Sequence, residues 1–121
     1  MHAAIIESAV AAGLNIRVLH ATDSRLSLSA SIPGESLCAG MALFSIDADG
    51  TPVCDLVHVD EKCRLRGVAS ALFDYAEQCC QRSAVSGMQL TQAAVDFYKA
   101  RGMSIPAHAQ IKTFHEWFDA P

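Results

Sequence analysis

Apolar and polar residues alternate along the first half of the chain with a period of two, the pattern of strands in a layered sheet. The alternation predicts four strands, at residues 15–20, 25–31, 40–47 and 53–59. Asp49-Gly50, followed by Pro52, predicts a hairpin turn between the last two strands. Because strand 53–59 carries apolar residues on both faces, we expect it to lie inside the sheet and to be covered on two sides.

The hydrophobic period changes from two to that of a helix at Gly67. Val68, Leu72 and Tyr75 fall on one helical stripe, so residues 67–82 should form an amphipathic helix. Further elements are predicted on either side: helices at 3–12 and 91–100, a strand at 87–90, and two final pieces near 103–105 and 110–118 that form strands, or a strand and an irregular tail. This order of elements predicts one α/β (α+β layered) domain over residues 1–121.

Composition and charge narrow the class of protein. The chain has 121 residues, of which 51% are hydrophobic and 18% charged, a balance typical of one soluble globular domain. Its net charge of −4 argues against nucleic acid as the main partner. No apolar run reaches the length of about 18–20 residues that a membrane span needs, and the N-terminus lacks the basic region of a signal peptide. We therefore expect a cytoplasmic protein that binds neither nucleic acid nor membranes.

The five cysteines give no sign of a disulfide framework or a zinc site. Their number is odd and no C-x-x-C pair occurs. The histidines do not have metal-ligand spacing either. We expect reduced thiols, buried or half-buried, and no metal centre.

The stretch CRLRGVASAL, residues 63–72, places two arginines directly before an apolar helix. Positive side chains suit a helix start poorly because the macrodipole is positive there, so a bound anion would explain Arg64 and Arg66. The first helical amides lack intrahelical partners, and Gly67 with the small Ala69 would let a phosphate approach the backbone. The alternative is a solvated basic turn beside an ordinary core helix.

The segment VDEKCRLRGVASAL, which contains these arginines, resembles the acyl-CoA-binding motif of the GNAT acyltransferase superfamily. That motif reads V-x-x-x-x-R-x-x-G-x-G/A across a strand, a loop and a helix. The residues in register with it are Val59, Arg64, Gly67 and Ala69.

A second segment, TQAAVDFYKARGM, is similar to another signature of the same family, N-x-x-A-x-x-x-Y-x-x-x-G-F. Ala94, Tyr98 and Gly102 match it. Thr91 stands where the family usually has Asn, and Met103 where it has Phe. The two motifs follow in the family's order and spacing, and the resemblance covers residues 53–103.

The resemblance implies a mixed, largely antiparallel central sheet, flanked by helices and splayed into a V. Acetyl-CoA, or another acyl-CoA, would lie in the notch as co-substrate, with its pantetheine along the backbone of Val57, His58 and Val59. Its pyrophosphate would lie at the helix start, against Arg64, Leu65, Arg66, Gly67, Val68, Ala69 and Ser70. Thr91 would make one further cofactor contact. A bulge or splay of the strand at residues 57–59 would leave one N–H free for the thioester oxygen.

By the same resemblance Tyr98 is the general acid that protonates the departing CoA thiolate. A phenol with a pKa of about 10 is protonated at neutral pH and can donate to a thiolate whose thiol has a pKa of about 8.5. The alternative for Tyr98 is a core aromatic. No general base is identified: Asp55 and His58 lie on opposite faces of one predicted strand, and either could accept a proton through water. We expect Trp117 in an apolar tail strand docked on the core rather than in an acceptor pocket.

The region before the strands is short for this family, which usually has a strand and two helices there to wall the acceptor groove. The acceptor site is then unusually open, or a second subunit completes it in a homodimer, or catalysis is lost. Two functions remain: an acyl-CoA-dependent N-acyltransferase acting on a small-molecule or protein amine, and a non-catalytic module that binds CoA or a protein partner. Tyr98 favours the enzyme, because a pure CoA sensor needs no proton donor at the sulfur.

Overall fold

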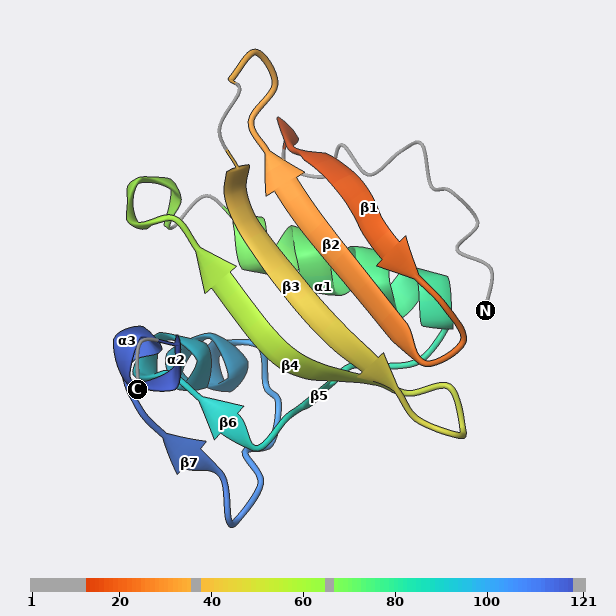
Figure 1. Cartoon of the computed structure of the whole chain (residues 1–121), viewed down its shortest axis with the longest axis vertical. Helices are drawn as coiled ribbons and strands as arrows, with labels where there is room; N and C mark the ends of the chain where they lie inside the picture. Colours follow the sequence, from red (N-terminus) through yellow and green to blue (C-terminus); the bar gives the residue numbers. More distant parts are fainter. Residues whose placement is uncertain (1–12, 36–37, 65–66, 119–121) are drawn as a thin grey trace.

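A five-stranded sheet forms the centre of the computed structural model, which describes residues 13–35, 38–64 and 67–118 (Figure 1). The strands lie in the spatial order β1-β2-β3-β4-β5. Their bounds are Asn15–Ala21 (β1), Arg25–Ser31 (β2), Cys38–Ile46 (β3), Pro52–Val59 (β4) and Val85–Ser86 (β5). The first four strands pair antiparallel, whereas β5 runs parallel to β4. Strands that follow one another in the chain are therefore neighbours in the sheet.

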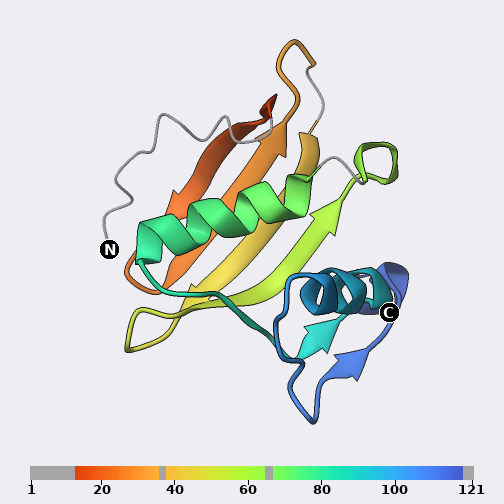
Figure 2. The same ribbon diagram turned by 180° about the vertical axis from the view of Figure 1, so that it is seen from behind.

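Helix α1 (Val68–Cys80) lies across one face of this sheet, the face toward the viewer in Figure 2. It follows β4 after a 3₁₀ turn, η2 (Glu61–Cys63), whose N-cap Asp60 accepts a hydrogen bond from the Lys62 N–H. The opposite face, seen in Figure 1, is not crossed by any helix in the described part of the chain. The core consequently lies between α1 and the sheet.

A smaller unit follows α1 and lies beside β4 (Figure 1). Its elements are β6 (Gln89–Leu90), α2 (Gln92–Ala100), β7 (Gln110–Ile111) and α3 (Phe114–Phe118). β6 and β7 pair in parallel as a separate two-stranded sheet. The chain therefore forms two sheets, one large and one small.

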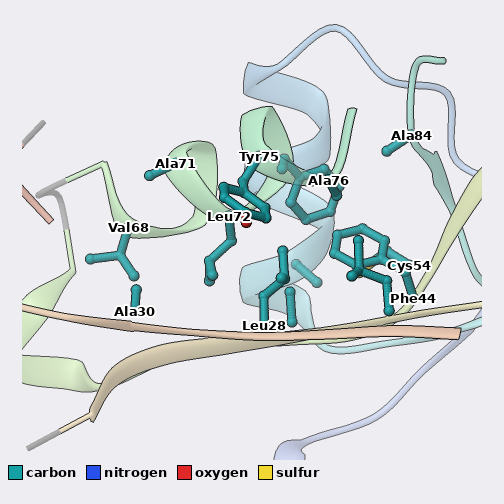
Figure 3. Packing of buried hydrophobic residues seen from close by; sticks show 14 of the residues in the cluster. Leu28, Ala30, Phe44, Cys54, Val68, Ala71, Leu72, Tyr75, Ala76 and Ala84 are labelled. Carbon is teal, nitrogen blue, oxygen red and sulfur yellow. The ribbon is translucent and has the colours of Figure 1, made fainter. Parts of the chain in front are cut away.

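The core forms because alternate residues of β2 and β3 point toward α1. Their buried inward side chains are Leu26, Leu28, Ala30, Ala42 and Phe44. Val68, Leu72 and Ala76 of α1 face them, since a spacing of about four residues keeps side chains on one helical stripe (Figure 3). Gly40 on β3 permits this close approach, because a Cβ there would lie 2.7 Å from Val68 Cγ1.

Phe73 on α1 connects the small unit to the large sheet. Its ring is 0% exposed and meets Phe44 of β3 edge-on, with 5.2 Å between ring centroids. On the other side it meets Phe97 of α2 at 5.1 Å, and Tyr98 lies 5.8 Å away. These are favourable distances for tilted and edge-to-face aromatic pairs. One aromatic cluster thus spans β3, α1 and α2.

Most of the predicted elements are confirmed. The four strands of the first half, the helix after Gly67 and the helix before Gly102 occur where the hydrophobic patterns predict them. The mixed, largely antiparallel sheet flanked by helices is confirmed as well. β4 lies between β3 and β5, but the prediction that it is covered on two sides is wrong for the described residues. α1 packs on one face, and no described helix crosses the other, where Leu56 and His58 are half-buried (Figure 1). The helix predicted at 3–12 falls outside the described residues.

The chain after α1 differs from the prediction in three places. The strand expected at 87–90 is reduced to β6 (Gln89–Leu90), because the chain leaves β4 after β5 (Val85–Ser86) and then pairs with β7. Residues 103–105 form no strand. The segment 110–118 is strand β7 followed by helix α3, because Thr113 and Glu116 form a capping box. Glu116 N–H donates to Thr113 Oγ1, and Thr113 N–H donates to Glu116 Oε1.

Candidate functional site

A notch opens where β4 and β6 separate. β5 pairs with β4 at Val53 and Cys54, and the Gly87 N–H donates to the Cys54 carbonyl at 2.9 Å. Beyond this point the chain turns away to pair with β7. From Asp55 onward, no described strand pairs with this edge of β4. The edge therefore presents backbone groups to whatever fills the notch.

A β-bulge lies at the start of the notch. Phe44 of β3 pairs with Cys54 and Leu43 with Leu56, so Asp55 is an extra residue in β4. Ser45 Oγ donates a hydrogen bond to the Asp55 carboxylate from the sheet face opposite α1. His58, which pairs with Met41, points to that same face. The prediction that Asp55 and His58 lie on opposite faces is therefore wrong, because the bulge shifts the alternation by one residue.

A cavity of about 60 Å³ lies in the notch. One wall is β4, at Asp55, Leu56 and Val57. The other walls come from β6, α2 and α3, and their residues are Gln89, Leu90, Thr91, Ala94, Tyr98 and Trp117. Ala94 and Tyr98 are four residues apart on α2, which places both side chains on one helix face. Three separate chain segments thus meet at this cavity.

Tyr98 is both a core residue and part of the cavity wall. It is 1% exposed, and its side chain is hydrogen-bonded to that of Cys54. Burial raises the pKa of Tyr98 far above its ordinary value, and the neighbouring Cys54 and Asp55 raise it further. Burial also raises the pKa of the Cys54 thiol, to about 12. Both groups are therefore neutral at physiological pH, and the phenol acts as a hydrogen-bond donor.

The start of α1 lies after β4, at the far end of the β4 open edge. Gly67, the N-cap, has a left-handed backbone (φ 75°) and no side chain caps the helix. The first intrahelical bond is donated by Ala71 N–H to the Gly67 carbonyl. The amides of Val68, Ala69 and Ser70 therefore have no acceptor inside the helix. Val68 is in the core, while Ala69 and Ser70 are half-buried.

Arg64 lies between η2 and this helix start, and its side chain is exposed. Within the described residues it forms no ion pair. Burial, and then the positive charge of Arg64, lower the pKa of His58, while Asp60 opposes this effect. Leu65 and Arg66, also predicted at this site, fall outside the described residues.

Thr91 is the N-cap of α2 and borders the cavity. Its Oγ1 accepts a hydrogen bond from the Ala94 N–H at 3.2 Å. This satisfies one of the free amides at the helix start. The threonine that stands in place of the family's asparagine thus has a structural role in the fold.

Trp117 is a site residue that the sequence analysis misplaced. It lies on helix α3, not in a strand, and forms part of the cavity wall. Its indole N–H donates to the Leu90 carbonyl at 3.0 Å. The spacing T-x-x-E at Thr113 and Glu116 is a helix-start signal that could have identified α3.

All five cysteines are free thiols, from the exposed Cys38 to the buried Cys54. Among residues 13–35, 38–64 and 67–118, no group of three or more His, Cys, Asp or Glu side chains could hold a metal ion. None of the helices described is long and apolar enough to cross a membrane.

Comparison with known proteins gives one match. The model of the acetyltransferase (GNAT) family matches residues 5–103, which is most of the chain. The matched range includes β1 to β4, α1 and α2, and it ends before β7 and α3. No curated protein and no solved structure matches the chain.

Proposed function

The chain belongs to the acetyltransferase (GNAT) family, and on that premise we propose that it transfers an acetyl group from acetyl-CoA to an amine. The observation that carries the proposal is the notch between β4 and β6. It combines an unpaired strand edge, a bulge and a cavity against which Tyr98 lies. These are the parts needed to hold a thioester beside a proton donor.

The start of α1 suits the pyrophosphate of CoA. Three helical amides without intrahelical acceptors, the positive end of the helix dipole and the exposed Arg64 favour an anion there. Ser70 would add a hydroxyl donor. The open edge of β4, at Val57 to Val59, would pair with the amide groups of pantetheine as an added strand does.

The reaction needs one proton removed and one supplied. The acyl-CoA supplies an activated acyl group: a C–N bond forms to the neutral amine, the C–S bond breaks, the amine loses one proton and the CoA sulfur gains one. We assign the donor at the sulfur to Tyr98, because its phenol lies in the cavity wall and is protonated at neutral pH. Cys54 remains a thiol and, through its hydrogen bond, holds this hydroxyl at the cavity.

The acceptor amine would enter past Asp55. This carboxylate is exposed, lines the cavity and is oriented by Ser45. An ammonium group would be attracted to it, and a water between the two would carry the proton away before attack. His58 lies on the same face as a second possible acceptor of that proton.

The test uses a panel of small amines, aminoacyl compounds and lysine peptides, with acetyl-CoA as donor and CoA release as readout. With any accepted amine, Tyr98→Phe should lower kcat by about 100-fold or more, while the dissociation constant of acetyl-CoA stays unchanged. Tyr75→Phe is the matched control, because Tyr75 is also buried but does not line the cavity. Full activity of Tyr98→Phe would refute the assignment of the proton donor.

A second candidate function is a non-catalytic module that binds CoA. The observation in its favour is that the Tyr98 hydroxyl is engaged by Cys54 in a small cavity. The two candidates differ in one result. The binding module would be favoured if the protein binds CoA tightly but releases no CoA from acetyl-CoA with any amine of the panel. No binding of CoA at all would exclude both.

A further inference from the structure

We propose that Trp117 limits the length of the acyl chain that this site accepts, so that acetyl-CoA is preferred over longer acyl-CoAs. The inference rests on the proposed function, because it assumes that the acyl group lies in the cavity between β4 and β6. It concerns a residue beyond the part of the chain that the family model matches.

Trp117 is fixed in place by hydrogen bonds at both ends of α3. At the helix start, Glu116 N–H donates to Thr113 Oγ1 at 3.1 Å and Thr113 N–H donates to Glu116 Oε1 at 2.9 Å. Toward the end of α3, the Trp117 indole N–H donates a hydrogen bond to the Leu90 carbonyl at 3.0 Å. The Lys112 ammonium lies 4.8 Å from the centre of the indole ring, a cation–π distance. The ring is therefore a defined wall and not a loose tail.

The Leu90 carbonyl links this wall to β6. It accepts from the Lys112 N–H at 2.9 Å as well as from the indole. Because a carbonyl oxygen has two lone pairs, these two donors satisfy it. Leu90 also borders the cavity, so the indole and the strand it binds form one continuous surface.

Trp117 is the wall that can move. Leu90, Ala94 and Tyr98 belong to the buried core, and displacing them would disrupt the packing of α2 on the rest of the molecule. On the β4 side the wall is strand backbone paired with β3. Trp117 is half-buried and lies on a helix of only five residues. A larger acyl group would therefore displace the indole first.

The cavity has the size of a short acyl group. Its volume of about 60 Å³ is less than half of the roughly 150 Å³ of an engineered apolar cavity that binds benzene. An acetyl group has three non-hydrogen atoms and matches this space. A butyryl group adds two methylenes, and it would have to push the indole away from the Leu90 carbonyl. Losing that hydrogen bond and its packing should weaken binding by about tenfold.

The test compares the binding of free CoA, acetyl-CoA and butyryl-CoA by calorimetry, which needs no acceptor amine. Wild type should bind butyryl-CoA about tenfold more weakly than acetyl-CoA, and Trp117→Ala should abolish this difference. Trp117→Phe, which keeps a ring but loses the N–H, should reduce the difference. Ile111→Ala is the matched control, since Ile111 is a 50% exposed residue of β7 that does not line the cavity. Free CoA should bind all four proteins equally.

The outcomes separate this inference from the proposed function. If CoA binds but the ratio of the two acyl-CoA affinities is the same in wild type, Trp117→Ala and Trp117→Phe, the role of Trp117 is refuted and the proposed function stands. If Trp117→Ala does not fold, an unchanged ratio in Trp117→Phe refutes it equally. If wild type binds neither CoA nor acetyl-CoA, both proposals are wrong.

Discussion

The sheet region (β1 to β5 with α1) and the C-terminal unit (β6, α2, β7 and α3) are built in different ways. Strands β1 to β4 pair along nearly their whole length, and Leu26, Leu28 and Leu72 between them and α1 are 0% exposed. β6 and β7 pair at only two positions. The core of the sheet region lies between its own strands and α1, and the buried residues of the C-terminal unit join that same core.

The two regions should differ in how easily they open, and the cavity lies between them. Regions with few buried contacts open locally at a lower free energy than the rest of a protein. The cavity lies at the border of the two regions, with β4 on one side and β6, α2 and α3 on the other. One wall is therefore strand backbone paired with β3, and in the opposite wall the half-buried Trp117 is the part that can adjust to a ligand.

The largest effect is expected at Phe73, which joins the two regions. Phe73→Ala should lower the free energy of unfolding by about 4 kcal/mol, because it removes a fully buried ring that contacts both β3 and α2. Urea unfolding followed by circular dichroism measures this. Ile111→Ala, on the exposed side of the C-terminal unit, should cost about 0.5 kcal/mol or less. Equal costs for the two variants would contradict the division into regions.

A substitution at Gly87 should disturb the segment that connects the two regions, where the Gly87 N–H donates to the Cys54 carbonyl. In Gly87→Ala the new Cβ would lie 2.4 Å from the Cys54 carbonyl oxygen, so the chain must shift, at a cost of about 1–3 kcal/mol. Hydrogen exchange should show faster opening of β5 and β6 than of β2 and β3. Gly34→Ala is the comparison variant: its Cβ would meet open space, and it should cost about 1 kcal/mol through its positive φ alone. A smaller loss at Gly87 than at Gly34 would show that the link is not tight.

A smaller effect is expected from the ion pairs that hold the end of α2 on α1. Arg101 Nη2 lies 2.7 Å from Asp74 and 2.9 Å from Glu77. Glu77→Gln should cost about 1 kcal/mol, because Glu77 is half-buried and also accepts the Ala84 N–H. Asp74→Asn should cost about 0.3 kcal/mol, since the Asp74 side chain is 60% exposed. The reverse order in thermal unfolding would show that burial does not decide the strength of this contact.

The smallest effect is expected from His58 of β4, which should make the free energy of unfolding depend on pH. Burial, and then Arg64, lower its pKa below the ordinary value of 6.5. The unfolded state therefore binds more protons in mildly acidic solution, and stability should fall as the pH drops below 6.5, then level off below the folded pKa. His58→Gln should reduce this slope in unfolding measured from pH 5 to 8. If the slope is unchanged, His58 is not a source of it.

The sheet region could be predicted from the sequence because its patterns are long. Strands of seven to nine residues and a thirteen-residue helix repeat their period several times. Apart from α2, the elements after α1 could not be predicted in this way, since β5, β6 and β7 have two residues each and α3 has five. Segments this short show no period, and tertiary contacts such as the Gly87–Cys54 hydrogen bond decide their structure.

The parts of the candidate site that lie in sequence motifs could be predicted. The parts that tertiary packing brings to the site could not. The residues around Gly67 and Tyr98 could be selected because two segments resemble motifs of the family, although their roles are still predictions. A bulge or splay in β4 was expected near residues 57–59, but its position at Asp55 and its effect on the faces of Asp55 and His58 were not, because the position of an extra residue depends on the partner strand. Trp117 was misplaced because its contact with Leu90 spans 27 residues of sequence.

The extra residue at the bulge also separates the shape of the site from the integrity of the core. If Asp55 were deleted, Cys54 and Leu56 could remain opposite Phe44 and Leu43, and Val57 would still point toward α1. The ladder between β3 and β4 would become regular, so the local bend and extra twist of β4 would be lost. A shortened chain of this kind should keep its hydrophobic interior while its crevice narrows. One extra residue in β4 is thus enough to change a regular antiparallel ladder into one that leaves space for a ligand.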